Sequence, residues 1–171
     1  EKTKWLILET LRSLSVGGFH TCAIKMDQSV KCWGSNDFGQ STPPEDLGPV
    51  LAISASKTHT CAIKMDQTVA CWGSNDFGQS TPPDDLGPVL AISGVMSHTC
   101  AIKIDETVKC WGYDSTPPED LGPVLAFSVG YEHTCAIQMD QSVKCWGKNG
   151  WGQSTPPEGL KVYIPEEKEE L

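Results

Sequence analysis

Short apolar runs alternate with turns rich in glycine and proline along the whole chain. One pattern, HTCAIKMDQSVKCWG at His20, returns with small changes at His59, His98 and His133, at intervals of 39, 39 and 35 residues. In each copy two apolar arms flank a polar tip, and a further apolar run such as Val50–Ser54 precedes the next copy. This pattern predicts three short strands in each period. A fixed period of this length indicates a repeat architecture, in which no unit buries its apolar face alone.

A fourth short strand is expected at Gly39–Thr42, where two prolines then end it. Strands this short, with glycine and proline between them, predict an all-β fold. A chain of 171 residues is long enough to bury a core as a single domain. We therefore expect a single repeat domain over residues 1–171, with repeats at about 11–47, 48–86, 87–121 and 122–160 and a closing strand with an acidic tail at 161–171.

The repetition also bears on chemistry. A catalytic centre needs unlike groups that converge on one point, whereas a residue present four times in equivalent places builds the unit. The repeated His, Cys and Trp residues are therefore predicted to be architectural, and the only arginine is Arg12. We expect no catalytic residues and predict that the protein is not an enzyme.

The eight cysteines form four pairs, each ten residues apart. If Met26–Asp27–Gln28 is a three-residue hairpin loop that ends in a left-handed residue, Cys22 lies opposite Cys32 in a non-hydrogen-bonded pair. The Cα atoms would then be ~4.5–5.5 Å apart, which suits a disulfide. The predicted disulfides are Cys22–Cys32, Cys61–Cys71, Cys100–Cys110 and Cys135–Cys145.

Two other interpretations of the cysteines remain open. Buried free thiols are common. Zinc held by His20, Cys22 and Cys32 would have only three ligands in each repeat, which suits a structural zinc site poorly. An even cysteine count at regular spacing favours disulfides. They would place the protein in an oxidising extracytoplasmic compartment: secreted, at the cell surface, or in an organelle lumen such as the thylakoid lumen.

Composition and charge narrow the class of partner. The net charge of −9 and the pI near 4.8 disfavour nucleic acid and anionic membranes, because both are bound through lysine and arginine. No apolar run is long enough to span a bilayer. The turn at Asn36–Gly39 has too few carboxylates for a dedicated calcium site. We expect no metal and no cofactor.

The repeated residues resemble a known family. The order His-Thr-Cys-Ala-Ile, then Asp-x-Ser/Thr-Val, then Cys-Trp-Gly-x-Asn-x-x-Gly-Gln resembles the regulator-of-chromosome-condensation repeat, in the cysteine-bearing form of secreted bacterial proteins of the β-lactamase inhibitory protein II type. The resemblance implies a β-propeller with four-stranded blades, of which this family usually has seven. The third repeat lacks four residues after Gly112. We therefore expect an array of four blades, either a small closed propeller or an open arc completed by a partner, with a shortened third blade.

Specificity is expected where the repeats differ from one another. The residues just before each repeated His would share one rim of a propeller, and aromatic residues and methionine are enriched at protein interfaces. Local packing of the same aromatic residues is the alternative. The candidate rim residues are Phe19, Lys57, Met96, Tyr131 and Glu132, and the candidate loop contacts are Phe38, Phe77, Tyr113 and Trp151.

The favoured function is a non-catalytic protein–protein interaction module, an accessory or structural subunit of a larger assembly. Its expected partners are proteins, including a large multisubunit complex. The resemblance implies two alternatives, a secreted enzyme inhibitor and a guanine-nucleotide exchange factor. Disulfides disfavour the exchange factor, since that work belongs to reducing compartments. A lectin or lyase is a further alternative, and fold analogy alone does not decide between these functions.

Overall fold

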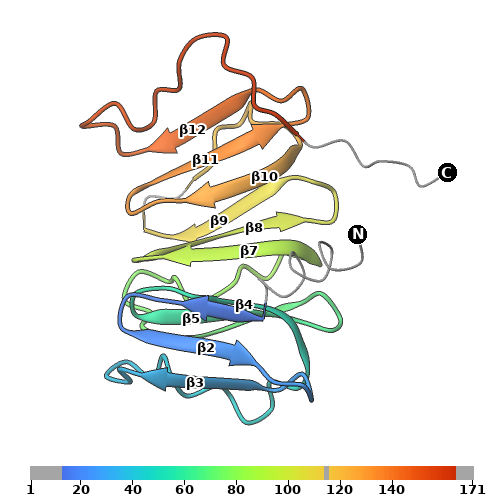
Figure 1. Cartoon of the computed structure of the whole chain (residues 1–171), viewed down its shortest axis with the longest axis vertical. Coiled ribbons are helices and arrows are strands. Elements are labelled where there is room, and N and C mark those ends of the chain that lie inside the picture. The colour runs from blue at the N-terminus through green and yellow to red at the C-terminus, as the bar shows by residue number, and fades with distance from the viewer. Residues whose placement is uncertain (1–12, 114–115, 165–171) are drawn as a thin grey trace, which may run out of the picture.

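The computed structural model describes residues 13–113 and 116–164, which form four three-stranded antiparallel sheets (Figure 1). Each sheet is a meander of consecutive strands. The strands are β1 (Leu14–Val16), β2 (His20–Ile24) and β3 (Val30–Gly34); β4 (Val50–Ala55), β5 (His59–Lys64) and β6 (Val69–Gly73); β7 (Val89–Val95), β8 (His98–Lys103) and β9 (Val108–Gly112); and β10 (Val124–Val129), β11 (His133–Gln138) and β12 (Val143–Gly147). The predicted all-β fold of four blade-like repeats is confirmed.

The prediction of a fourth strand at Gly39–Thr42 is wrong. Residues Gly39–Thr42 form consecutive turns, because the amide of Gly39 donates to the carbonyl of Asn36 at 3.0 Å and the amide of Thr42 donates to that of Gly39 at 3.0 Å. Gly39 has φ 80°, a left-handed conformation outside the extended region of a β-strand. Each described sheet therefore has three strands, and the polar segment after it serves as a loop.

The hairpin register follows the prediction. Cys22 pairs with Cys32, and Ile24 pairs with Val30. The last loop residue, Gln28, has φ 65°, the predicted left-handed conformation. The same register joins the central and outer strands of the other three sheets. The hairpin is thus fixed by local turn geometry and repeated without change.

The sheets lie one above another along the long axis, with β3 at one end and β12 at the other (Figure 1). The first strands meet in sequence, β1 with β4, β4 with β7 and β7 with β10. The described repeats therefore form an open array and not a closed ring. Of the two arrangements expected from the sequence, the closed ring is therefore not formed by the described repeats.

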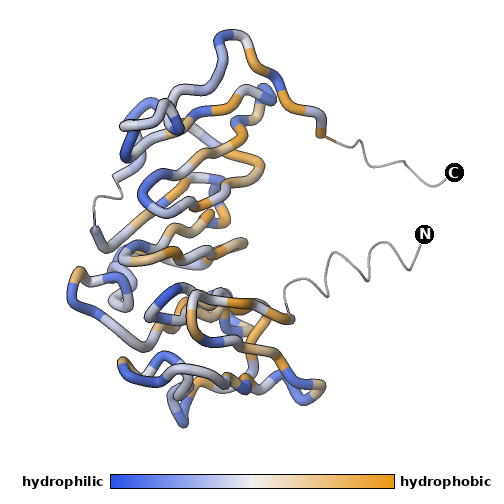
Figure 2. Tube along the Cα trace, turned by 60° about the vertical axis from the view of Figure 1, so that its left-hand side comes forward, coloured by the Kyte–Doolittle hydropathy of each residue, from blue (hydrophilic) through white to orange (hydrophobic). Residues whose placement is uncertain are grey.

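The core is divided among the three junctions between repeats. Each junction has its own cluster of buried apolar residues, and hydrophilic positions gather in the connecting turns (Figure 2). A tryptophan from the later repeat enters each cluster, and an aliphatic residue from the preceding loop covers it. The pairs are Leu47 with Trp72, Leu86 with Trp111, and Leu121 with Trp146. A single repeat therefore has no complete core of its own.

The departures from regularity fall outside the strands. β9 has five residues like the other third strands, so the four residues missing from the third repeat come from the turn after Gly112. The expected first strand of repeat one, Leu11–Ser15, begins outside the described residues, which contain β1. Lys161 of the expected closing strand pairs with Ser142 of its own repeat. The acidic tail, residues 165–171, lies outside the described residues.

Candidate functional site

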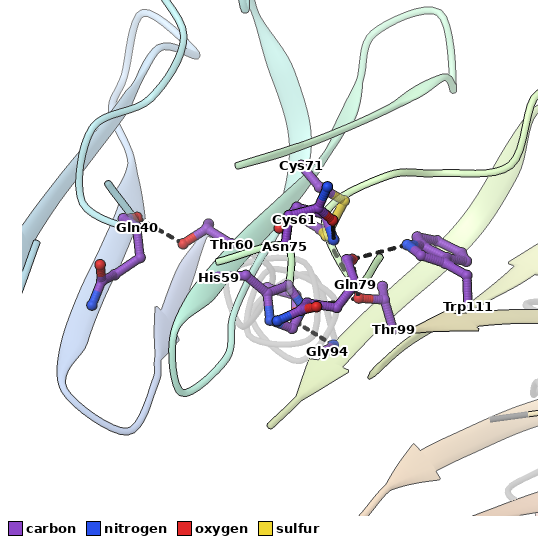
Figure 3. The surroundings of a disulfide bond; sticks show 12 residues. Gln40, His59, Thr60, Cys61, Cys71, Asn75, Gln79, Gly94, Thr99 and Trp111 are labelled. Atoms are coloured by element: carbon purple, nitrogen blue, oxygen red, sulfur yellow. Dashed lines mark hydrogen bonds between the residues drawn. A yellow bond between two sulfur atoms is a disulfide. The ribbon is translucent and has the colours of Figure 1, made fainter. Parts of the chain in front are cut away.

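Residues that recur in the repeats join one repeat to the next. The Nε2 atom of His59 lies 2.8 Å from the Oγ1 atom of Thr99, and that hydroxyl donates to the carbonyl of Gln79 at 3.0 Å. Figure 3 draws these three residues. The single hydroxyl hydrogen of Thr99 is used in the second bond, so Nε2 of His59 carries the proton that the first bond needs. The indole of Trp111 donates to the same Gln79 carbonyl at 2.9 Å. These residues are therefore architectural.

Burial sets the protonation of the histidines in this network. His59 is fully buried, and the resulting loss of hydration lowers its pKa from 6.5 to about 4. Burial also lowers the pKa of His20, which lies 2.6 Å from Thr60 in the first junction. Both side chains are neutral at pH 7.

The four predicted disulfides are present. The Cα atoms of Cys22 and Cys32 are 4.1 Å apart, and those of the other three pairs are 4.0 Å apart, slightly closer than expected. A covalent bridge across a non-hydrogen-bonded pair holds the two strands together at their narrowest point. The described residues contain no group of three His, Cys, Asp or Glu side chains suited to a metal ion. The disulfides indicate an oxidising environment.

One pocket is lined mostly by residues at positions where the repeats differ. This pocket has a volume of about 230 Å³ and spans the second to fourth repeats. It combines part of the predicted rim with part of the predicted loop set, because the turns before β8 and β11 come close to the loops after β6 and β9. The lining residues are Phe77, Met96, Ser97, His98, Tyr113, Tyr131, Glu132 and Lys148.

Aromatic side chains form the apolar wall of the pocket. The rings of Phe77 and Tyr113 meet edge to face, with centroids 5.3 Å apart. These two side chains and Tyr131 are each more than half exposed to solvent. Met96 adds a flexible side chain from a turn in which its φ is 54°, a conformation uncommon for a residue other than glycine. The wall is accessible and held by an aromatic contact between repeats.

A charged pair forms the polar side of the same pocket. The Nζ atom of Lys148 lies 2.8 Å from both carboxylate oxygens of Glu132. The hydrogen bond to Glu132, followed by the attraction of its charge, raises the pKa of Lys148. Sequence reasoning missed Lys148, although the first two repeats have serine at the equivalent position, Ser35 and Ser74. Variation between repeats, the criterion that selected the other residues, also identifies this one.

Four predicted residues lie outside this pocket. At the first junction the ammonium of Lys57 lies 5.7 Å from the centre of the Phe19 ring, a separate cation–π contact. Phe38 is half exposed on the first loop, and Trp151 is almost fully exposed on the last. The structure thus brings together five of the nine candidates: Met96, Tyr131, Glu132, Phe77 and Tyr113.

A model of the regulator of chromosome condensation (RCC1) repeat matches residues 11–40 and 50–79. The other two repeats have the same residue order at the matched positions, apart from the four residues missing in the third. No curated protein sequence matches the chain. None of the described residues forms a helix that could cross a lipid bilayer.

Solved structures share this fold. The ectodomain of the receptor kinase CR4 from Physcomitrella patens is 25% identical with a TM-score of 0.74, and the match covers 87% of this chain and 46% of that one. The CRINKLY WD40 ectodomain of the receptor kinase ACR4 from Arabidopsis thaliana is 31% identical with a TM-score of 0.67, covering 79% of this chain and 50% of that one.

A third similar structure is Prp20p, the RCC1 protein of Saccharomyces cerevisiae. It is 19% identical with a TM-score of 0.67, and the match covers 90% of this chain and 50% of that one. This likeness concerns the fold alone. The chain spans about half the length of each of the three structures. The first and second repeats of this chain are therefore repeats of the regulator of chromosome condensation (RCC1) family, and the third and fourth share their residue order.

Proposed function

We propose that the chain is a non-catalytic protein-binding module that acts as an accessory or structural subunit of a larger assembly. The observation that carries the proposal is the pocket formed by Phe77, Met96, Tyr113, Tyr131 and the Glu132–Lys148 pair. Apart from His98, it gathers positions at which the repeats differ, while the other shared side chains are used between repeats. A surface that varies on a constant scaffold suits recognition.

The chemistry of the pocket suits a protein partner. Exposed aromatic rings and a methionine offer apolar area, and the adjacent charged pair offers a donor and an acceptor at the edge. Interface centres are enriched in these residue types and are surrounded by a polar rim. The expected contact is an apolar side chain of the partner that inserts beside Tyr131, with a polar group next to Glu132 and Lys148.

The proposed location is extracytoplasmic: secreted, at the cell surface, or in an organelle lumen such as that of the thylakoid. Four disulfides support an oxidising compartment. The similar receptor-kinase structures are ectodomains. The yeast RCC1 protein, whose likeness concerns the fold, is described as bound to Kap60 and as binding Gsp1p and histones. A net charge of −9 favours a protein partner over nucleic acid here.

The absence of catalysis is part of the proposal. His59, Thr99 and Trp111 are engaged between repeats, and the cysteines are held in disulfides. Glu132 and Lys148 form the charged pair of the pocket and are hydrogen-bonded to each other. Recognition, and not chemistry on a bound substrate, is the function that this surface supports best.

The test uses two identical loops. Phe77 and Phe38 occupy the same position of the same loop sequence and are equally exposed, but only Phe77 lines the pocket. A partner is captured from an extracytoplasmic fraction under non-reducing conditions, identified and purified. Its affinity is then measured against the wild-type chain, Phe77→Ala and Phe38→Ala. We expect Phe77→Ala to weaken binding by about 10-fold or more, and Phe38→Ala to leave it within about 2-fold.

Equal losses in the two variants, or no saturable partner, would contradict the proposal. A partner enzyme that loses its activity on binding would instead support the inhibitor function. Tyr131→Ala provides a second measurement from the rim side of the pocket, and its effect should match that of Phe77→Ala in direction.

A further inference from the structure

The two ends of the array expose complementary faces. At the first internal junction, repeat one contributes His20, the Gln40 carbonyl and Leu47, which we call the acceptor face. Repeat two contributes Thr60 and Trp72, which we call the donor face. The hydroxyl of Thr60 and the indole of Trp72 both donate to the Gln40 carbonyl, at 2.9 Å each. The second junction pairs the same groups, and the third junction forms without the glutamine.

Repeat one has an uncovered donor face. Trp33 is 51% exposed, whereas its equivalents in the later repeats are 6% to 8% exposed. Thr21 is partly exposed, whereas Thr60 and Thr99 are fully buried. A large tryptophan left half in water at the position of a core residue marks a face that is built to be covered.

Repeat four has an uncovered acceptor face. Leu160 is 39% exposed, whereas the equivalent leucines in the three internal junctions are 3% to 6% exposed. His133 and Gln153 are partly exposed, whereas His59 and Gln79 are buried. Repeat four thus offers the same three groups that each accept a donor face elsewhere.

Gln153 is the most informative member of this face. The third repeat lacks the equivalent glutamine, and its junction with repeat four forms without it. The fourth repeat has kept the glutamine, although no described repeat follows it. Its side chain accepts a hydrogen bond from the Trp151 amide at 2.8 Å, as Gln40 does from Phe38 at 2.9 Å, so the loop that presents the carbonyl is formed.

We propose that a second copy of this chain covers both faces. Repeat one of each copy docks on repeat four of the other, with Trp33 and Thr21 placed at the Gln153 carbonyl and His133. The contact repeats the interface of the first two internal junctions. Because the two ends differ, the contact is head to tail, and two copies close into a ring of eight repeats.

The first test measures mass in solution by light scattering and native mass spectrometry across micromolar concentrations. The wild-type chain is expected to contain two copies. Trp33→Glu is expected to be a monomer, since a hot-spot loss weakens each of the two contacts by about 30-fold. Met26→Glu is the matched control, because Met26 is fully exposed at a hairpin tip away from both faces, and it should stay a dimer. A monomeric wild type, an open-ended polymer, or a dimeric Trp33→Glu chain would overturn the proposal.

The second test mixes two variants. Leu160→Glu alters the acceptor face and should be monomeric alone, like Trp33→Glu. In a mixture the acceptor face of the Trp33→Glu chain and the donor face of the Leu160→Glu chain are both intact. One wild-type contact therefore re-forms, and the mixture should contain mixed dimers that neither variant forms alone. A mixture that stays monomeric would exclude head-to-tail pairing. Retained circular dichroism in each variant shows that the monomers are folded.

Discussion

The indole N–H of Trp72 donates to the carbonyl of Gln40 in the preceding repeat, 2.9 Å away. Trp111 has the same contact with Gln79 at the next junction. Trp146 is equally buried at the third junction, but its Nε1 atom has no hydrogen-bond partner among the described residues. The shortened loop of the third repeat has lost the glutamine that would supply the acceptor. A buried donor without an acceptor costs ~1–3 kcal/mol.

Replacing each tryptophan with phenylalanine should therefore have unequal effects. Trp72→Phe and Trp111→Phe remove a hydrogen bond together with ring volume. Trp146→Phe removes similar volume but also removes an unsatisfied donor. We expect Trp146→Phe to lower the free energy of unfolding by about 2 kcal/mol less than Trp72→Phe. Urea denaturation followed by circular dichroism measures the difference, and equal losses at the three junctions would contradict the account.

The free energy of unfolding should fall as the pH is lowered, over a pH range determined by the pKa of His59. Burial lowers its pKa in the folded chain to about 4, from an ordinary value of 6.5. Between these pH values the unfolded chain binds a proton that the folded chain does not, so stability is present at neutral pH and is lost as the pH falls. The loss from this side chain approaches about 3 kcal/mol near pH 4. Unfolding free energies measured from pH 7.5 to 4.5 should follow this slope.

A His59→Gln variant is the control for the acid effect. It should be less stable at pH 7.5, because the bond to Thr99 is disturbed, but its stability should change less with pH. His20, whose pKa is also lowered by burial, keeps a part of the slope in the same direction. Hydrogen bonds from Thr107 and Lys103 lower the pKa of exposed Asp105 to about 2, so Asp105 contributes below this window and not within it. An unchanged slope in His59→Gln would rule out His59 as the source.

The hairpin was predictable from sequence because its determinants are local. A loop ending at left-handed Gln28 fixes which residues face each other, and a strand period of two carries that register out to Cys22 and Cys32. The same local logic failed at Gly39–Thr42. There the chain turns so that the carbonyl of Gln40 points to the next repeat, and only the neighbouring Trp72 explains why.

The pocket was only partly predictable for a related reason. Variation between repeats selected Tyr131 and Tyr113 separately, one from a turn before a strand and the other from a loop after a strand. Both residues line the same pocket because of the way adjacent sheets are placed relative to each other. The sequence of a single repeat does not determine that placement. The open array, and the lack of a hydrogen-bond acceptor for the Trp146 indole among the described residues, are likewise properties of the junctions between repeats. They depend on which repeat precedes which.

Glycine after each repeated tryptophan should be indispensable at an internal junction. Gly73 has φ 102°, and a Cβ atom there would lie 2.7 Å from the Thr58 carbonyl oxygen and 2.8 Å from the His59 Cα atom. Both neighbours are backbone atoms of the paired strand and cannot move aside. Gly73→Ala is expected to cost about 3 kcal/mol or more, from steric overlap added to backbone strain.

Gly78 provides the matched comparison. It has φ 80°, but a Cβ atom there would meet nothing within 4 Å. Gly78→Ala should therefore cost only about 1–2 kcal/mol, the strain of a left-handed alanine. Thermal and urea unfolding of both variants measure the difference. Similar losses at Gly73 and Gly78 would mean that conformation alone, and not the close strand, requires the repeated glycine.

The four disulfides should differ in how easily they are reduced. In each of the first three disulfides one of the two cysteines is fully buried. These cysteines are Cys22, Cys61 and Cys100. In Cys135–Cys145 both residues are partly exposed, because no described repeat covers the far side of repeat four. A thiolate must reach a sulfur atom to open a disulfide, so access controls the rate. In the monomeric Trp33→Glu variant, under native conditions with limiting dithiothreitol, Cys135–Cys145 should open first.

Peptide mapping after alkylation identifies the pair that opens first. Each bridge closes a short loop, which corresponds to ~2–3 kcal/mol of stability, so early reduction of Cys135–Cys145 should weaken repeat four before the others. Replacing Cys135 and Cys145 with alanine should remove the fast phase of reduction and leave the three slower ones unchanged. If Cys61–Cys71 in the second repeat opened at the same rate, burial between repeats would not be what protects the bridges. The order of reduction would also shift if a second chain covered repeat four, since Cys135–Cys145 would then be protected at high protein concentration and exposed on dilution.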